Sequence, residues 1–119
     1  MKQSKIMEAY NTVKEMHDRT DLPMQVLWAL FQVDNLLTPF YDFEIEQEQK
    51  IIDKYHPVKT DAGFTFESAE QRVAFEKEFS ELQNMEKDFE DFSKPHVQIY
   101  QGLTLKQMHG LKDFIEFTE

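Results

Sequence analysis

The chain contains no cysteine, and only three glycines and four prolines stand among its 119 residues. Without cysteine it can form no disulfide, no thiolate metal site and no cysteine nucleophile. So few turn-forming residues argue against a sandwich or barrel with many turns, whereas a few long helices need few turn residues between them. The scarcity of glycine and proline therefore favours a mainly α fold.

Long apolar runs are missing as well. No stretch approaches the roughly 18 apolar residues that a membrane span needs. The opening segment MKQSKIMEAY also lacks the continuous apolar core of a signal peptide. We therefore expect a protein that has no membrane partner and stays in the cytoplasm.

Basic residues are outnumbered, because 23 Asp and Glu against 13 Lys and Arg give a formal net charge of −10. Nearly all of the excess lies in residues 42–54, with five acids and two bases, and in residues 67–91, with nine acids and three bases. A nucleic-acid-binding face needs basic residues, so we expect no direct nucleic-acid partner. The 11 Phe still provide a core for one domain over residues 1–119.

Four segments show the apolar spacing of a helix face. In the third, the large apolar residues recur every three or four positions: Phe75, Phe79, Leu82, Met85, Phe89 and Phe92. Ser68 with Gln71, and Thr104 with Gln107, stand in the positions of capping boxes at two helix starts. The predicted helices cover about residues 4–19, 23–55, 68–92 and 104–117.

The second and third helices are expected to form a long antiparallel pair, joined by a turn near residues 56–63. Pro39 removes one backbone hydrogen bond from the second helix, and no glycine or cap follows it, so we expect a kink near residues 36–39 within one helix. Residues 64–66 and 97–100 read as short extended pieces. These two pieces are candidates for a small two-stranded patch.

The last predicted helix carries a glycine in its interior. Gly110 costs roughly 1 kcal/mol of helix propensity relative to alanine. We interpret it as a place where another element packs closely against the helix.

The order of these segments resembles a group of small uncharacterised proteins encoded by phages and prophages of Gram-positive gut bacteria. The resemblance covers almost the full chain, through MKQSKIMEAYNTVKEM, LPMQVLWAL, IIDKY, DAGFTF, FEKEFSEL and LTLKQMHGLKDFIEF. None of these segments is a catalytic signature. The resemblance implies an α-helical fold and a location in the bacterial host cell or in the virion, and it implies no site residue.

The sequence offers little that could carry chemistry. Glu44 and Glu48 share a helix face, and Asp53 precedes His56 by three residues, which are spacings found in metal sites of helical bundles. Such sites normally use a Glu-x-x-His sequence, and this chain has none. No nucleophile or phosphate-loop motif accompanies the four histidines. We therefore expect a protein that is not an enzyme, with no catalytic residue, cofactor or metal.

A protein contact surface is predicted on the third helix. Glu78 and Glu86 fall at its apolar stripe, where full burial of a lone carboxylate would be costly. Either the stripe is only partly covered within one chain, or its acids line a contact with a second copy. The predicted contact residues are Glu78, Glu81, Glu86, Asp88, Phe89 and Phe92.

The expected function is interaction or assembly through this helical surface, with a protein partner or with itself in a homo-oligomer. An alternative is that the acidic helices imitate nucleic-acid phosphates and inhibit a nucleic-acid-binding protein of the host. A third interpretation is that the acidic surface serves only solubility.

Overall fold

The computed structural model describes residues 1–89, 92–99 and 102–119, and over these residues the protein is mainly helical, as predicted. The helices are α1 (Gln3–Met16), α2 (Met24–Tyr55), α3 (Ala69–Gln83) and α4 (Leu105–Leu111). The strands are β1 (Val58–Thr60), β2 (Gly63–Thr65), β3 (His96–Gln98) and β4 (Glu116–Thr118).

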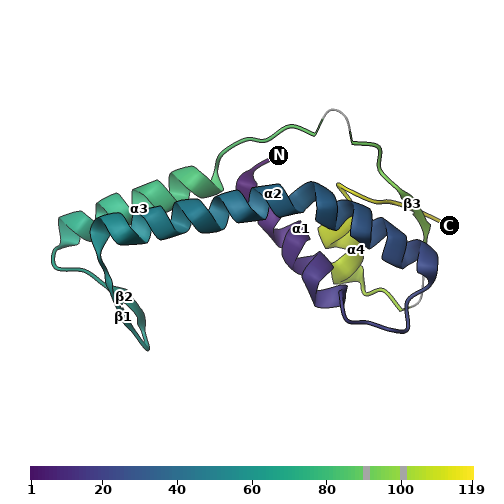
Figure 1. The fold of residues 1–119 in the computed structure, drawn as a ribbon, viewed down its shortest axis with the longest axis horizontal. Helices are drawn as coiled ribbons and strands as arrows, with labels where there is room; N and C mark the ends of the chain where they lie inside the picture. The colour runs from purple at the N-terminus through teal and green to yellow at the C-terminus, as the bar shows by residue number, and fades with distance from the viewer. Residues whose placement is uncertain (90–91, 100–101) are drawn as a thin grey trace.

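Figure 1 shows two parts joined by α2. In the first part, which we call the body, α1 and β3 pack on residues 24–41 of α2, while α4 packs on α1 and β4 pairs with β3. In the second, which we call the arm, residues 42–55 of α2 lie beside α3, and the β1–β2 hairpin projects from the tip. The radius of gyration is 17.5 Å, whereas a compact domain of this length has about 13.5 Å. The arm therefore makes the molecule elongated.

The hydrophobic core lies in the body. α1 and α2 each bury one face with the helical spacing that the sequence shows, and residues near the C-terminus close the core from the other side. Tyr10 of α1 stacks on Tyr41 of α2, with ring centroids 4.3 Å apart. The core residues with the least exposure are Ile6, Ala9, Val13, Met16, Ala29, Val33, Leu37, Val97, Leu111, Phe114 and Ile115.

α2 passes through Pro39 as a single helix, which confirms the prediction of one helix rather than two. Pro39 faces solvent, and in the preceding turn the Thr38 hydroxyl donates to the Asp34 backbone oxygen at 2.8 Å. The helix ends at Tyr55, and the next residue, His56, adopts the left-handed conformation with φ 47°. Pro57 then disfavours further helix, because the residue before a proline avoids the α region.

α3 is shorter than predicted, since it ends at Gln83 rather than near residue 92. The Asn84 side chain donates to the Ser80 backbone oxygen at 2.9 Å, which satisfies a carbonyl at the helix end. The following residues pair instead with the N-terminal residues: the Gln3 N–H donates to the Met85 oxygen and the Lys87 N–H to the Met1 oxygen, both at 2.8 Å. These bonds replace the helical ones, so the regular spacing of the later Phe residues gave a wrong prediction.

The predicted pairing of residues 64–66 with residues 97–100 is wrong. β1 and β2 form an antiparallel hairpin in which Val58 pairs with Thr65, so this segment finds its partner locally. β3 instead pairs in parallel with β4, which lies where the last predicted helix was expected to continue. Val97 in β3 is buried in the body, which anchors this second sheet there. Tyr100 of the predicted strand falls outside the described residues.

The helix starts and the interior glycine agree with the sequence interpretation. Ser68 accepts the Gln71 N–H at 3.2 Å, and Thr104 with Gln107 forms a complete capping box. A Cβ placed on Gly110 would lie 2.8 Å from the Thr12 hydroxyl oxygen. Gly110 is thus the point where α4 packs closely against α1.

Candidate contact surfaces

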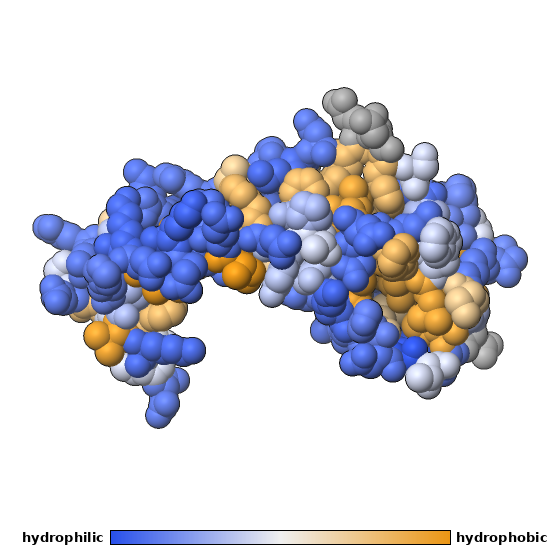
Figure 2. Space-filling model, in the orientation of Figure 1, coloured by the Kyte–Doolittle hydropathy of each residue, from blue (hydrophilic) through white to orange (hydrophobic). Residues whose placement is uncertain are grey.

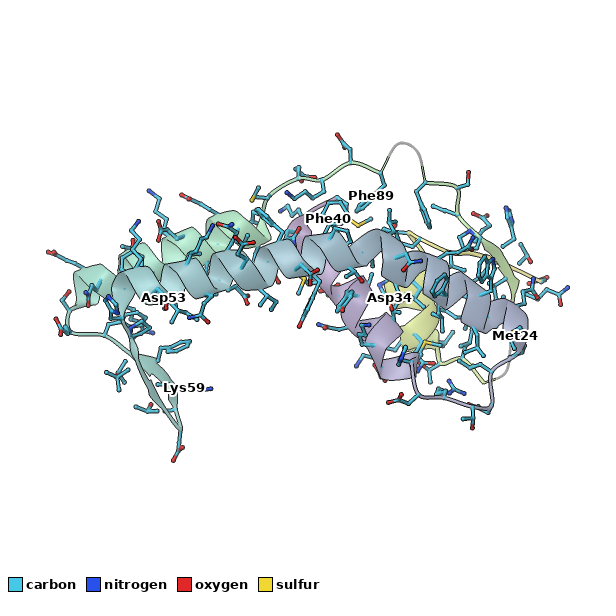
Figure 3. All side chains as sticks on the ribbon, viewed as in Figure 1. Met24, Asp34, Phe40, Asp53, Lys59 and Phe89 are labelled. Atoms are coloured by element: carbon cyan, nitrogen blue, oxygen red, sulfur yellow. The ribbon has the colours of Figure 1, made fainter. Side chains whose placement is uncertain are left out.

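The six predicted contact residues do not form one continuous helix face. Glu78 and Glu81 lie on α3 in the arm, whereas the later residues belong to the extended segment after it. Phe89 packs against Phe40 (Figure 3), with ring centroids 5.1 Å apart, and against Phe114, with ring centroids 5.3 Å apart. Phe92 also contacts the Phe114 ring, at 6.5 Å. The two Phe residues therefore contribute to the body rather than to the arm.

The two carboxylates that raised the question of a second copy are compensated within the chain. Glu78 accepts a hydrogen bond from Lys54 at 2.8 Å, which lowers the pKa of Glu78 and raises that of Lys54. The carboxylate of Glu86 lies 3.0 Å from the amino group of Met1. Neither acid needs a partner molecule to balance its charge.

A groove of about 360 Å³ opens between α2 and α3, and we call it the arm groove. Its α2 wall comes from residues at i, i+4 and i+8, which form one row along a helix. Its α3 wall combines apolar side chains with carboxylates. The lining residues are Phe43, Gln47, Ile51, Glu78, Glu81, Leu82 and Met85.

Two lysines of the chain already contact the lining of the arm groove. The Lys87 ammonium lies 4.6 Å from the centre of the Phe43 ring, a cation–π contact. The Lys54 ammonium binds Glu78. Phe43 and Ile51 are separated by about 12 Å along the α2 axis at 1.5 Å per residue. The groove therefore combines an apolar floor with positions that accept positive charge.

A second surface lies at the start of α2, and we call its four residues, Met24, Leu27, Trp28 and Phe31, the aromatic face. Trp28 is 59% exposed and Phe31 is 53% exposed, and their rings stack with centroids 5.4 Å apart. Met24 is 77% exposed. Figure 2 shows apolar residues gathered over the body, while the arm is mainly hydrophilic on this side.

The surroundings of the aromatic face carry little unbalanced charge. Residues 22–33 include no Asp, Glu, Lys or Arg. A hollow of about 170 Å³ between α1 and α2 adjoins Leu27 and Phe31. The charged residue of this hollow, Asp34, pairs with Lys14 at 3.2 Å, and this contact raises the pKa of Lys14. An uncharged, aromatic surface of this kind is typical of the centre of a protein interface.

The sequence interpretation missed the aromatic face, although a signal was present. Leu27, Trp28 and Phe31 make the apolar stripe of α2 wider than one packed face requires. α1 covers one face of this helix, and α4 packs on α1, so Trp28 and Phe31 remain exposed. A stripe that extends too far round a helix is thus the pattern that would have revealed this surface.

Glu44 is the arm's buried carboxylate, with 5% of its surface exposed. Burial and, to a smaller extent, the charge of Glu48 raise the pKa of Glu44, and burial raises the pKa of Glu48 as well. Asp53 accepts a hydrogen bond from Gln49 at 2.9 Å. Over residues 1–89, 92–99 and 102–119, no three side chains of metal-ligand type surround a common point.

Two further findings bear on how the protein is placed among others. In the part of the chain that the structure covers, every helix is too short or too polar to cross a bilayer. Comparisons with family models, with curated proteins and with solved structures found no match for this chain.

Proposed function

We propose that the protein is a non-enzymatic interaction or assembly protein that acts through helical contact surfaces and forms a homodimer through its aromatic face. The observation that supports this most directly is the stacked, exposed pair of Trp28 and Phe31. Tryptophan and other large aromatics are the residues that most often dominate binding energy when a partner covers them. In water alone the same side chains only add unfavourable apolar surface.

A second copy of the chain is the partner that the charges favour. The chain carries a net charge of −10, so two copies repel each other over most of their surfaces. The aromatic face lies within residues 22–33, which carry no charged side chain, and it can meet itself across a two-fold axis without opposing like charges. Dimerisation here would leave both arms free.

The arm has a separate role in this proposal. The second half of α2 and α3 form an antiparallel pair, in which Lys54 binds Glu78 and the Tyr55 ring lies 6.0 Å from the Phe75 ring. The pair projects from the body (Figure 1), and the arm groove opens between its two helices. In this proposal the protein acts in the bacterial host cell or in the virion, and the resemblance of its sequence to phage-encoded proteins supports that location.

Imitation of nucleic-acid phosphates is less well supported. A mimic needs rows of carboxylates that stay free to bind a basic surface. Several acids of the arm are instead neutralised by cations of the same chain, which breaks up such rows. The pairs are Glu46 with Lys50, Glu76 with Arg72 and Glu78 with Lys54.

The oligomeric state tests the proposed homodimer. Sedimentation velocity and light scattering between about 1 and about 100 µM should show a dimer. Trp28→Glu should weaken the dimer by about tenfold or more, because it places like charges against each other in the contact. Val73→Glu is the matched control, since Val73 is 64% exposed on α3 and the change of charge is the same.

Two outcomes would refute the homodimer. One is a monomer over the whole concentration range. The other is an equal loss of dimer in the Val73→Glu and Trp28→Glu variants, which would show a general effect of added charge. Circular dichroism of each variant establishes that the helices remain folded.

A further inference from the structure

We propose that the arm groove binds a basic amphipathic helix of a partner protein. This inference extends the proposed function, because it names a partner class for a second surface. It does not depend on dimerisation, since the arm groove is formed by α2 and α3 of one chain and shares no residue with the aromatic face.

The floor of the arm groove suits apolar anchors spaced along a helix. Phe43 and Ile51 lie on α2, and Leu82 and Met85 complete the floor from the α3 side. The span of about 12 Å between Phe43 and Ile51 matches about two turns of a bound helix, with anchors at i, i+4 and i+7. Met85, which is partly exposed, can adapt to different apolar side chains because methionine is unbranched and polarisable.

The rim of the arm groove selects the charge of the partner. Glu81 is exposed beside the floor, and within the described residues it makes no ion pair. The α2 side of the lining carries no charged residue, whereas the segment that supplies the other side, residues 67–91, has a net charge of −6. Lysine or arginine residues on the side of a bound helix that faces α3 would therefore meet negative charge.

The chain's own lysines show how such a partner would be recognised. Lys87 places an ammonium group over the Phe43 ring, and Lys54 places one against Glu78. These contacts show that the aromatic floor and the acidic rim both accept cations. A second copy of this chain is a poor occupant, because its own arm is acidic and would bring like charges together.

A model peptide tests the inference directly. The probe is a synthetic peptide of about 18 residues, composed of leucine and lysine with the leucines at helical spacing. Fluorescence anisotropy of the labelled peptide measures binding to the full chain. We expect a Kd of about 10 to 100 µM, and binding at least about tenfold weaker for a scrambled peptide of the same composition.

Variants of the protein locate the binding site. Glu81→Lys should weaken binding by about tenfold or more, because it reverses the charge of the rim. Asp53→Lys is the matched control, because it changes the net charge equally. Asp53 is exposed and lies about 200° round α2 from Ile51, away from the lining of the arm groove. We expect this control to change the Kd by less than about twofold.

The results separate this inference from the proposed dimer. The Trp28→Glu variant should bind the peptide as tightly as the unmodified chain, whether or not it dimerises. Equal losses in the Glu81→Lys and Asp53→Lys variants, or equal binding of the scrambled peptide, would show general charge attraction and overturn the proposal. Undetectable binding at about 1 mM peptide would overturn it as well.

Discussion

The body and the arm bury apolar residues to very different extents, although α2 runs through both. In the body, side chains from α1, from α2 and from the residues near the C-terminus are completely enclosed. In the described part of the arm, the apolar residues classed as buried are Phe75 and Leu82. The difference indicates that the body supplies most of the free energy of folding, while the arm is a thinner structure that presents surface.

Both parts contain an aromatic cluster, and the cluster of the body is more deeply buried than that of the arm. In the body, Phe114 is fully buried and is contacted by Phe89 and Phe92. In the arm, Phe75 is surrounded by rings that reach solvent. These rings belong to Tyr55, Phe64, Phe66 and Phe79, with centroids 4.6 to 6.0 Å from that of Phe75. The arm cluster holds the hairpin against the two helices.

Truncation of the central ring in each cluster should give the largest change in the free energy of unfolding. Phe114→Ala should lower the free energy of unfolding by about 4 kcal/mol, because the enclosed site cannot collapse around the cavity. Phe75→Ala should cost about 2 kcal/mol, because the partly exposed rings around it can close the gap. Urea denaturation followed by circular dichroism measures both values. Equal costs would mean that the arm is as firmly packed as the body.

Substitution at the contact between α1 and α4 should give an intermediate change in the free energy of unfolding. Gly110→Ala should lower the free energy of unfolding by about 1 to 2 kcal/mol, although alanine is the better helix former, because its Cβ would meet the Thr12 hydroxyl. In a Thr12→Ala background the same substitution should cost nothing or stabilise the protein. If the double variant is as unstable as Gly110→Ala alone, the close approach to Thr12 is not the cause.

Substitution of Glu44, the buried acid of the arm, should give a smaller change in the free energy of unfolding, and this change should depend on pH. The pKa of Glu44 is higher in the folded protein than in the unfolded chain, where it is that of an ordinary glutamate, about 4.3. As the pH rises from this value through the folded pKa, Glu44 ionises in its buried position and the protein loses stability. Glu44→Gln should therefore stabilise the protein by about 1 kcal/mol at pH 7, and this gain should disappear near pH 4.

Thermal unfolding of both proteins across this pH range measures the gain. Glu46→Gln is the matched control, because Glu46 is exposed and pairs with Lys50 at the surface, so its substitution should change the free energy of unfolding by less than about 0.5 kcal/mol. A gain for Glu44→Gln that is the same at every pH would show that the charge of Glu44 is not its source.

The sequence predicted the helical parts best where burial and spacing agree. α1 and α2 repeat apolar residues on one face, and these residues are the ones buried in the core. The end of α3 could not be predicted, because Phe89 and Phe92 continue the helical spacing but pack as part of an extended segment. The bonds that decide this come from Met1 and Gln3, which are distant in the sequence.

The candidate surfaces were predicted less well than the helices. Glu78 and Glu81 were expected at a contact surface, and they do line the arm groove. The contribution of Phe43 and Ile51 depends on which side of α2 meets α3, and spacing alone does not fix this. For the aromatic face the wide apolar stripe of α2 did indicate a second apolar side, but only the tertiary arrangement shows that Trp28 and Phe31 stay exposed there.

One continuous helix carries both surfaces, so the number of residues between them sets the direction in which the arm points. Phe31 and Phe43 lie on the same uninterrupted α2, and each residue turns a helix by about 100° and advances it by about 1.5 Å. Insertion or loss of a single residue between Tyr41 and Phe43 would swing the α2 wall of the arm groove roughly a quarter of the way round the axis, while the core residues up to Leu37 stay in register. Chain length in this region would thus control where a partner held by the arm sits relative to the body.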